Sequence, residues 1–360
     1  MSSTAAIARQ RAHSHRLEGA QLADPASAVA WFGMVQAQDY RAALWAVGLR
    51  VQAATEAAVE QALRERRILR TWPARGTLHF VAAADVRWLL QLLAPRAIAR
   101  SARRFKELEL DEAVLARSRT LLTRALQGGR ALPREALYQV LEAGRVSPAG
   151  QRGIHILGRL AQEGLLCFGA RADKQQTFTL LDEWVPGSRT LPREAALAEL
   201  AARYVAGHGP VTAADLAWWS GLTIADARAG LDLAQPRVAL EKIAGQPYWR
   251  LTSAPQPGPA ARSVQLLPAF DEYLVGYQDR SAVLDPVQSK RINAGGGMLS
   301  PVIVLGGHVI GTWRRVVKRG GAVITPAWFA SPTPAQARAV RQAAEHYSAF
   351  LGIPVTLAEA

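Results

Sequence analysis

The feature that most constrains the fold is an order of elements that recurs three times, with two or three helices followed by two β-rich runs. Apolar residues at helical spacing mark the first part of each repeat, and a turn separates the two β-rich runs. The expected helices are residues 7–18, 24–35 and 55–67, then 132–141 and 153–163, then 195–206, 212–219 and 223–233. The expected hairpins are residues 68–81, 165–180 and 238–252. This order is typical of a winged-helix module, so the sequence predicts three such modules in tandem.

The pattern changes after a Pro/Gly-rich stretch, residues 254–261, which we interpret as a linker. Short β-rich runs separated by glycines follow, and a helix is expected over residues 333–351. The expected strands are residues 264–267, 298–305, 308–315 and 322–324. The sequence therefore predicts an α+β fold that ends in a small β-barrel or a curled sheet, with a terminal helix. The predicted domains are 1–125, which includes long helices after residue 84, then 126–188, 189–255 and 256–360.

The charge of the chain favours nucleic acid as a partner. Lys+Arg number 43 against 29 Asp+Glu, a formal net charge of +14, and only five of the basic residues are lysines. Arginine presents a planar fork that suits phosphates and base edges, although an arginine-rich composition also follows from a GC-rich genome. The four predicted domains carry +8, +1, +1 and +4 in chain order, so the first and last domains are the expected DNA-binding regions.

Several classes of protein are excluded or disfavoured by what the sequence lacks. Its single cysteine, Cys167, rules out an internal disulfide and a four-cysteine zinc site, and its apolar neighbours indicate a buried small side chain. The seven histidines show no metal-ligand spacing, and no phosphate-binding loop is present. We expect no cofactor and no metal. No run reaches about 18 apolar residues and no signal sequence begins the chain, so we expect a cytoplasmic protein, associated with the nucleoid.

Two segments are polar where their surroundings are apolar. The first comprises Gln36, Ala37, Gln38 and Asp39, at the end of an apolar helix. Its two carboxamides could orient a water and stabilise a developing positive charge, or could simply satisfy backbone groups at a helix end.

The second polar segment is 266–281, where Asp271, Glu272, Asp279 and Arg280 follow a predicted strand. Taken structurally, Asp271 is a helix N-cap and Asp279 forms a surface ion pair with Arg280. Taken functionally, the segment is a polar loop that closes over a site.

These segments carry a resemblance to a known family. The motifs VQAQ at 35–38, RTWPARGTLH at 70–79, LLPAFDEY at 266–273 with DRS at 279–281, and IGTWRR at 310–315 resemble those of the AlkZ/YcaQ winged-helix DNA glycosylases. The resemblance extends in order from about residue 7 to residue 355. It implies three tandem winged helices in a C-shaped arrangement with a β-barrel. The family's catalytic motif is Gln-x-Gln in the AlkZ-like branch, which Gln36 and Gln38 match, and Gln-x-Asp in the YcaQ-like branch.

The resemblance implies monofunctional hydrolysis of the N-glycosidic bond of N7-alkylguanine or N3-alkyladenine, interstrand crosslinks included, in base excision repair or in self-resistance to a genotoxin. Gln36 would position the attacking water, and Gln38 would hold it or contact the sugar. The expected DNA-binding residues are Arg75, Thr77, His79, Arg280, Arg314 and Arg315. The expected supporting residues are Asp39, Asp271 and Tyr273. His79 is equally well explained as a core imidazole.

The expected substrate is double-stranded DNA that contains alkylated purines, bound by a monomer away from any membrane. Two other functions stay open from the residues alone. The first is a transcription regulator built on the same winged helices, although three unlike modules and a barrel in one chain are unlike a regulator that pairs two equal subunits. The second is sequestration of a genotoxic molecule or of damaged DNA without turnover. Release of a free alkylated base from a duplex distinguishes the glycosylase from both.

Overall fold

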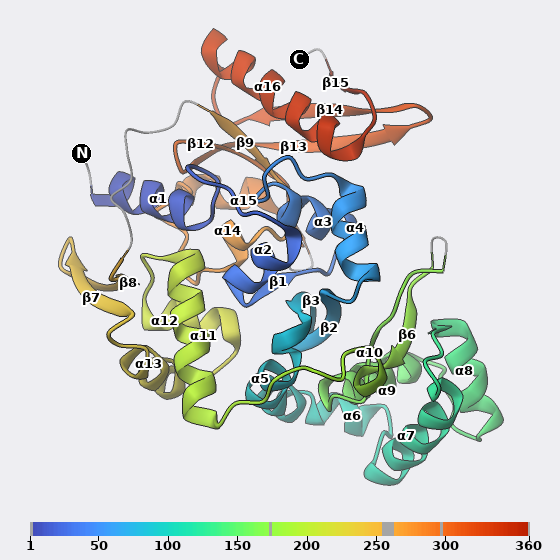
Figure 1. Ribbon diagram of the computed structural model, residues 1–360. Coiled ribbons are helices and arrows are strands. Elements are labelled where there is room, and N and C mark those ends of the chain that lie inside the picture. The colour runs from blue at the N-terminus through green and yellow to red at the C-terminus, as the bar shows by residue number, and fades with distance from the viewer. Residues whose placement is uncertain (1–2, 173–174, 254–262, 296–297, 359–360) are drawn as a thin grey trace. The chain divides into compact units, whose positions relative to one another are not determined.

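The computed structural model of the protein describes residues 3–172, 175–253, 263–295 and 298–358. The chain forms two compact units (Figure 1). The first unit combines residues 1–60, 197–219 and 223–360, and the second combines 61–196 with 220–222. The predicted linker, 254–261, lies outside the described residues. The division into four domains, like the assignment of winged-helix modules, remains a prediction.

The N-terminal segment contains the three predicted helices, but the first lies four residues earlier than predicted and the second and third each end three residues earlier. Its elements are α1 (Ser3–Ser14), α2 (Pro25–Phe32), β1 (Met34–Gln36), α3 (Tyr40–Gly48) and α4 (Glu56–Arg64). Asp24 caps α2 by accepting from two backbone N–H groups, and Pro25 occupies the first turn, as predicted. The helix was expected to run through Val35 but ends at Phe32. The reason is Gly33, whose φ of 83° turns the chain out of the helix and into a short strand.

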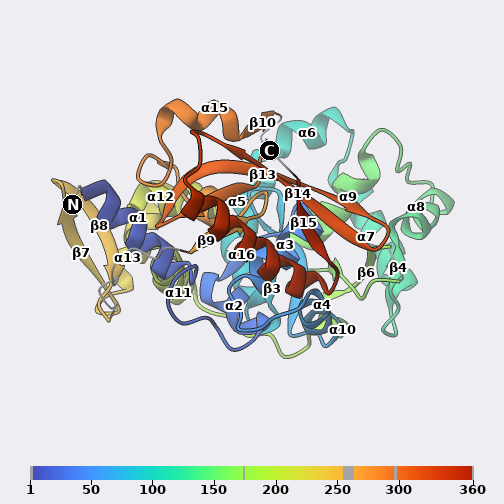
Figure 2. The same ribbon diagram turned by 90° about the horizontal axis from the view of Figure 1, so that it is seen from above.

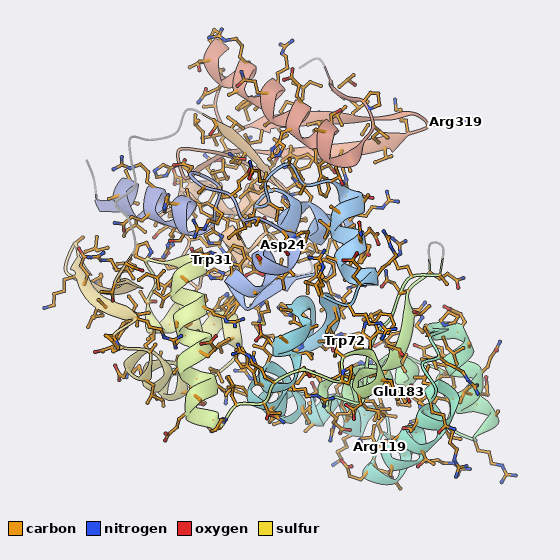
Figure 3. All side chains as sticks on the ribbon, in the orientation of Figure 1. Asp24, Trp31, Trp72, Arg119, Glu183 and Arg319 are labelled. Atoms are coloured by element: carbon orange, nitrogen blue, oxygen red, sulfur yellow. The ribbon has the colours of Figure 1, made fainter. Side chains whose placement is uncertain are left out.

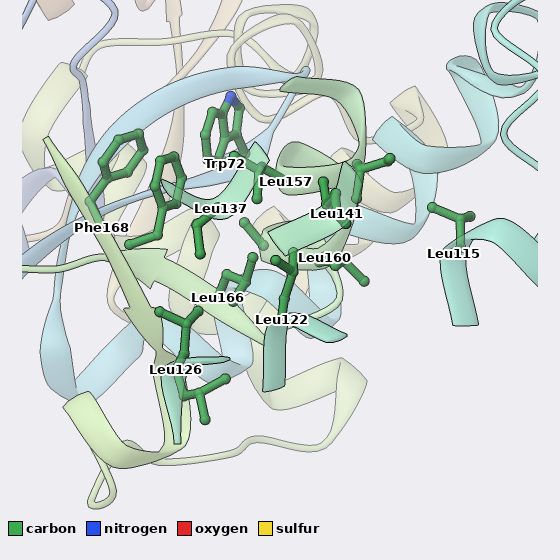
Figure 4. Packing of buried hydrophobic residues seen from close by; sticks show 14 of the residues in the cluster. Trp72, Leu115, Leu122, Leu126, Leu137, Leu141, Leu157, Leu160, Leu166 and Phe168 are labelled. Carbon is green, nitrogen blue, oxygen red and sulfur yellow. The ribbon is translucent and has the colours of Figure 1, made fainter. Parts of the chain in front are cut away.

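The second unit has its own apolar core. Its elements are β2 (Ile68–Ala74), β3 (Thr77–Ala82), η1 (Ala83–Asp85), α5 (Val86–Arg100), α6 (Ala102–Glu107), α7 (Glu112–Leu126), β4 (Leu132–Pro133), α8 (Arg134–Ala143), α9 (Arg152–Gln162), β5 (Leu166–Phe168), β6 (Thr177–Leu180) and α10 (Leu181–Trp184). Leucines of α7, α8 and α9 interdigitate with Trp72 and Phe168 (Figure 4). Both predicted hairpins form, since β2 pairs with β3 and β5 with β6. Cys167 lies on β5 with no exposed surface, and burial raises the pKa of its thiol.

The third helical group also ends in its predicted hairpin. Its elements are α11 (Arg193–His208), α12 (Ala213–Ser220), α13 (Ile224–Leu233), β7 (Val238–Ile243) and β8 (Gln246–Leu251). The strands β7 and β8 pair antiparallel from Val238 opposite Leu251 to Ile243 opposite Gln246. The turn therefore consists of residues 244 and 245, inside the hairpin that was predicted over 238–252.

The C-terminal part is a five-stranded open sheet, so of the two predicted forms, a small β-barrel or a curled sheet, it has the second. Its elements are β9 (Val264–Leu267), α14 (Glu272–Val275), η2 (Pro286–Gln288), α15 (Ser289–Ile292), β10 (Asn293–Gly295), β11 (Met298–Leu299), β12 (Val302–Leu305), β13 (His308–Lys318), β14 (Gly321–Trp328), α16 (Pro334–Leu351) and β15 (Val355–Leu357). Five strands follow the order β15-β14-β13-β12-β9, which leaves β9 and β15 as the two edges among the described strands. The sheet is thus a half-barrel, and α16 lies across it (Figure 2).

Long-range side-chain bonds join the N-terminal helices to this sheet within the first unit. The indole Nε1 of Trp45, on α3, donates to the carbonyl of Leu266 on β9 at 2.7 Å. Inside the sheet, Nε1 of Trp313 on β13 donates to the carbonyl of Leu267 at 2.8 Å. The capping box of Thr333 and Gln336 fixes the start of α16. Across the described residues, no helix is both long enough and apolar enough to span a membrane.

Candidate active site

The two glutamines of the motif lie just before α3 and differ in exposure. Gln36 is the last residue of β1 and is 8% exposed, whereas Gln38, two residues later, is exposed. Asp39 is the N-cap of α3 and accepts from the backbone N–H of Ala42 at 3.1 Å. The helix before the motif ends at Phe32, four residues before Gln36, so Gln36 is not a capping residue of that helix. The motif therefore places one carboxamide inside the first unit and one at its surface.

A buried carboxylate, Glu272, holds the main chain of Gln36. Its Oε1 accepts from the backbone N–H of Gln36 at 2.7 Å, across 236 residues of sequence. Its Oε2 accepts from the indole Nε1 of Trp219 at 2.8 Å and faces Nε2 of His208 at 3.3 Å. Glu272 is only 1% exposed, so these donors replace the water that a carboxylate would otherwise require.

The His208 ring faces a backbone carbonyl with one nitrogen and the Glu272 carboxyl group with the other. Nδ1 of His208 lies 3.1 Å from the carbonyl of Tyr204, which can only accept, so Nδ1 carries a hydrogen. Nε2 lies 3.3 Å from Oε2 of Glu272, and the two side chains are 0% and 1% exposed.

Asp271 is the N-cap of α14, as predicted, and also one half of a buried ion pair. Its Oδ1 accepts from the backbone N–H of Tyr273 at 2.9 Å. The guanidinium of Arg50 binds both carboxylate oxygens, at 2.7 and 2.9 Å, and donates further to the carbonyls of His15 and Ala46. Such a bidentate pair fixes the start of α14, and Glu272 is the first residue of that helix.

Buried aromatic hydroxyls complete the support behind Glu272. Tyr273 donates to the carbonyl of Gly307 at 2.6 Å, and Tyr277 donates to the carbonyl of His208 at 2.6 Å. Because the Tyr277 hydroxyl has one hydrogen, it accepts from Nε2 of His15 at 2.9 Å. Burial lowers the pKa of His15 well below its ordinary value, and the charges of His208, Arg50 and Arg11 lower it further.

The predicted ion pair between Asp279 and Arg280 is absent. Asp279 instead accepts from the backbone and hydroxyl of Ser281, at 2.8 and 3.0 Å, while Nε of Arg280 donates to the carbonyl of Leu274 at 2.6 Å. Adjacent side chains in a turn point in different directions, and each finds a nearer local partner. Burial lowers the pKa of the partly buried Arg280 guanidinium.

Arg314 and Arg315 lie on β13, beside a surface hairpin tip. Arg314 is exposed, whereas burial lowers the pKa of Arg315, a shift that the nearby charge of Asp39 opposes. The β13–β14 hairpin continues past them with Val316 and Val317, which are 56% and 47% exposed. Arg319 lies at the tip of this hairpin (Figure 3).

The other predicted DNA-binding residues belong to the second unit, on the β2–β3 hairpin. Arg75 is in the two-residue turn with a φ of 54° and is partly exposed. The hydroxyl of Thr77 donates to the carbonyl of Ala74 at 3.3 Å. His79 is fully buried, and its Nδ1 donates to the carbonyl of Thr77 at 3.0 Å, which is the position of a core imidazole.

The first unit thus brings together Gln36, Asp271 and Tyr273, while the sequence analysis missed Glu272, His208 and Trp219 as site residues. Glu272 had a signal, since it is an acid inside an apolar run between two residues that were predicted. His208 and Trp219 had none, because only the fold brings them to Glu272. Within the described ranges, no group of three or more His, Cys, Asp or Glu side chains could hold a metal ion.

Comparison with known proteins gives consistent matches over most of the chain. The model of a family described as "DNA glycosylase AlkZ-like" matches residues 29–350. A curated protein of Streptomyces sahachiroi, "Interstrand DNA cross-link repair glycosylase", is 28% identical over 349 residues, which cover 89% of this chain and 88% of that protein. The solved structure of Streptomyces sahachiroi DNA glycosylase AlkZ superposes with a TM-score of 0.83 at 22% identity, over 99% of this chain and all of that one. The α+β fold is therefore shared with that structure.

Proposed function

Because the chain belongs to the AlkZ-like family of DNA glycosylases, we propose that it hydrolyses the N-glycosidic bond of N7-alkylguanine in double-stranded DNA. The proposal extends to N3-alkyladenine and to interstrand crosslinks, and the name of the curated relative supports the crosslinks. The observation that carries the proposal is the hydrogen bond from the backbone of Gln36 to the buried Glu272, which fixes the main chain that carries this carboxamide, two residues before the exposed Gln38. The comparisons give no support to a transcription regulator.

The chemistry suits two carboxamides. A purine alkylated at N7 or N3 is already cationic, so the electron pair of the breaking bond neutralises it and no strong general acid is needed. Water adds to C1′ of the sugar through an oxocarbenium-like transition state, and its proton passes to solvent. The protein has to place that water and stabilise positive charge on the sugar, which oriented amide dipoles do.

In this mechanism Gln36 positions the water, and Gln38 holds the water or contacts the sugar. Glu272 is a positioning residue, because it touches the Gln36 backbone rather than the reacting atoms. Asp39 supports the site by starting α3 directly after the motif. Asp271 and Tyr273 support the site indirectly, because their bonds fix α14 and therefore the position of Glu272.

Substitution of Gln36 tests the assignment. Gln36→Ala should lower the single-turnover release of free base from a duplex containing N7-methylguanine by about 100-fold or more, and leave DNA affinity nearly unchanged. Gln342→Ala, an exposed position on α16, is the matched control. An unchanged release rate in Gln36→Ala would contradict the catalytic role. Binding of undamaged DNA by the native protein without any release would instead favour a regulator or a sequestering protein.

We further propose that Arg75, Thr77, Arg280, Arg314 and Arg315 bind the DNA backbone, and that the buried His79 supports the hairpin that carries Arg75 and Thr77. Each arginine that contacts a phosphate releases counterions when DNA binds. Arg314→Ala should therefore reduce the slope of log affinity against log salt concentration by about one. Arg338→Ala, an exposed arginine on α16, should leave the slope unchanged. Equal slopes for the Arg314 variant and the native protein would remove Arg314 from the interface.

A DNA lesion as substrate would place the protein in base excision repair at the nucleoid, or in self-resistance to a DNA-alkylating compound. The proposed form that acts on DNA is the monomer. Excision measured over a panel of N7- and N3-alkyl adducts and a crosslinked duplex would identify the physiological lesion class.

A further inference from the structure

The second unit contains a cavity that the chemistry at Gln36 does not use. Its volume is about 380 Å³, and it opens where the β2–β3 hairpin approaches the β5–β6 hairpin and the first turns of α8 and α9. Small-molecule sites in proteins span roughly 300–1,000 Å³, so the cavity can take one small planar group but not a base pair with its backbone.

Three aromatic rings form the apolar wall of this cavity. Trp72 and Phe168 have ring centroids 5.1 Å apart, and Phe168 and Phe178 have centroids 4.5 Å apart. The rings of Trp72 and Phe178 are parallel to within 8°. The three side chains belong to the core cluster, where Trp72 and Phe168 are each 8% exposed, and all three also line the cavity. The wall is therefore rigid and already in place before any ligand binds.

Cations and amides surround the aromatic wall. The Arg70 side chain, 7% exposed, has its guanidinium carbon 4.9 Å from the Phe168 ring centroid. Arg134, the first residue of α8, is exposed and pairs with Glu135 at 3.2 Å. The charged residues that line the cavity are Arg70, Arg134 and Glu135, so their formal charges sum to +1. Gln175 and Gln176 add carboxamides, which can donate to and accept from the edge of a base.

We infer that this cavity binds one unpaired nucleotide. An aromatic wall favours a planar ring, because bases stack on aromatic side chains whatever their identity. The guanidinium groups favour a ligand whose planar ring carries a phosphate over an uncharged aromatic compound. A base inside a duplex has both faces covered by its neighbours, so only an unpaired or flipped base can present a face to the wall. The inference is independent of the proposed hydrolysis, because every residue involved lies in the second unit.

The test is binding of a five-nucleotide single strand with 2-aminopurine at its centre to the full-length protein. Binding should quench 2-aminopurine fluorescence. Trp72→Leu should weaken binding about tenfold, through lost stacking. Because Trp72 is a core residue, Arg134→Glu serves as a second variant at an exposed position, with a weakening of about tenfold from charge reversal. Arg117→Glu, an exposed arginine on α7 outside the cavity, is the matched control.

Further ligands separate a strand from a free nucleotide. A deoxynucleoside monophosphate that binds as tightly as the strand would show that a free nucleotide suffices, and a nucleoside without phosphate should bind much more weakly than either. Equal binding of a strand with an abasic centre would overturn the inference, and so would equal losses in Arg134→Glu and Arg117→Glu. Gln36→Ala should bind the strand as the native protein does. A failure of the proposed glycosylase would therefore leave this test unaffected.

Discussion

At the residue scale, Glu272 determines where the main chain of Gln36 lies. A backbone N–H bonded to a carboxylate is held more strongly than one bonded to a neutral acceptor, and at 1% exposure water does not compete for the bond. The cost of burying the carboxylate is offset by the Gln36 N–H and by the indole N–H of Trp219, which both donate to it. The position of the motif therefore depends on a residue that never reaches the substrate.

Two substitutions of Glu272 separate positioning from general stability. Glu272→Gln keeps an oxygen for the Gln36 N–H but presents an amide to Trp219, so one buried donor is left unpaired at a cost of about 1–3 kcal/mol in the free energy of unfolding. Glu272→Ala removes the acceptor of Gln36 as well, and a displacement of about 1 Å can lower a rate about 100-fold. We expect Glu272→Gln to release base at a rate within tenfold of the native rate, and Glu272→Ala to lose much more of that rate. Glu345→Gln, exposed on α16, is the control.

Equal release by the two Glu272 variants, measured well below their unfolding temperatures, would show that Glu272 acts only on stability. A large loss in Glu272→Gln alone would instead require a direct role for the negative charge.

The buried His15 makes stability depend on pH. Its folded-state pKa lies well below the unfolded value of about 6.5. Below pH 6.5 the imidazole of His15 is therefore protonated in the unfolded chain but stays neutral in the folded chain until the pH approaches the lower pKa. This contribution to stability is complete above pH 6.5 and is lost as pH falls toward the folded pKa, at up to about 1.4 kcal/mol per pH unit. Chemical denaturation at several pH values should show a steeper loss for the native protein than for His15→Gln. Parallel curves would contradict the role of His15.

At the element scale, the short strand β1 depends on how α2 ends. Gly33 has a φ of 83° and a ψ of −46°, a backbone conformation that L-residues with a side chain disfavour. A Cβ built at Gly33 would meet no atom closer than 3.9 Å, so space does not limit a larger residue there. The backbone conformation alone therefore requires glycine, and it delivers Gln36 to the end of a strand.

Gly33→Ala should lower the free energy of unfolding by about 1–2 kcal/mol and reduce base release, because the strain is relieved by moving β1. The matched substitution is Gly158→Ala inside α9, where a Cβ meets nothing within 4 Å and φ is ordinary. That variant should gain about 0.5–1 kcal/mol from helix propensity. Thermal unfolding of both variants measures these changes in stability. If Gly33→Ala had the same stability as the native protein, the turn would be able to accept a side chain without strain.

Local signals explain which elements the sequence predicts. Asp24 followed by Pro25 located a helix start, and the charged or glycine tips located all three hairpins, because caps and turns depend on neighbouring residues. The end of α2 was wrong by three residues, since a single glycine outweighed the apolar run that continues to Val35. The sequence left a barrel and a curled sheet open, because closure of a sheet depends on which edge strands pair, and the period-two patterns do not encode that pairing.

At the scale of the whole molecule, the first unit is assembled from three separate stretches of chain. Gln36 and Arg50 come from the first, Trp219 from the second and Glu272 from the third. The sequence therefore marked the motif and the acid at Glu272, but not that the two are in contact. A buried contact across 236 residues can be inferred only once the chain is folded.

This assembly predicts how fragments behave. A fragment of residues 1–255 lacks Asp271 and Glu272, which leaves the buried Arg50 without its counter-ion at a cost of several kcal/mol. In this fragment we expect the first unit to stay unfolded, so that only the second unit melts cooperatively and no base is released, and co-expression with 256–360 should restore release. A fragment of residues 61–196, which contains a complete apolar cluster, should unfold cooperatively by itself. Circular dichroism melts of both fragments check this, and a larger cooperative loss of helical signal per molecule in 1–255 than in 61–196 would contradict it.

The burial of Cys167 has a practical consequence for measurements on this enzyme family member. The chain contains one cysteine, it has no exposed surface, and burial suppresses its thiolate. A maleimide dye should therefore not react with the native protein, and should label only a cysteine that has been introduced at the surface. One fluorophore on each unit, at any two exposed positions, would then report distances between the units on single molecules before and after DNA is added, without first removing a native thiol.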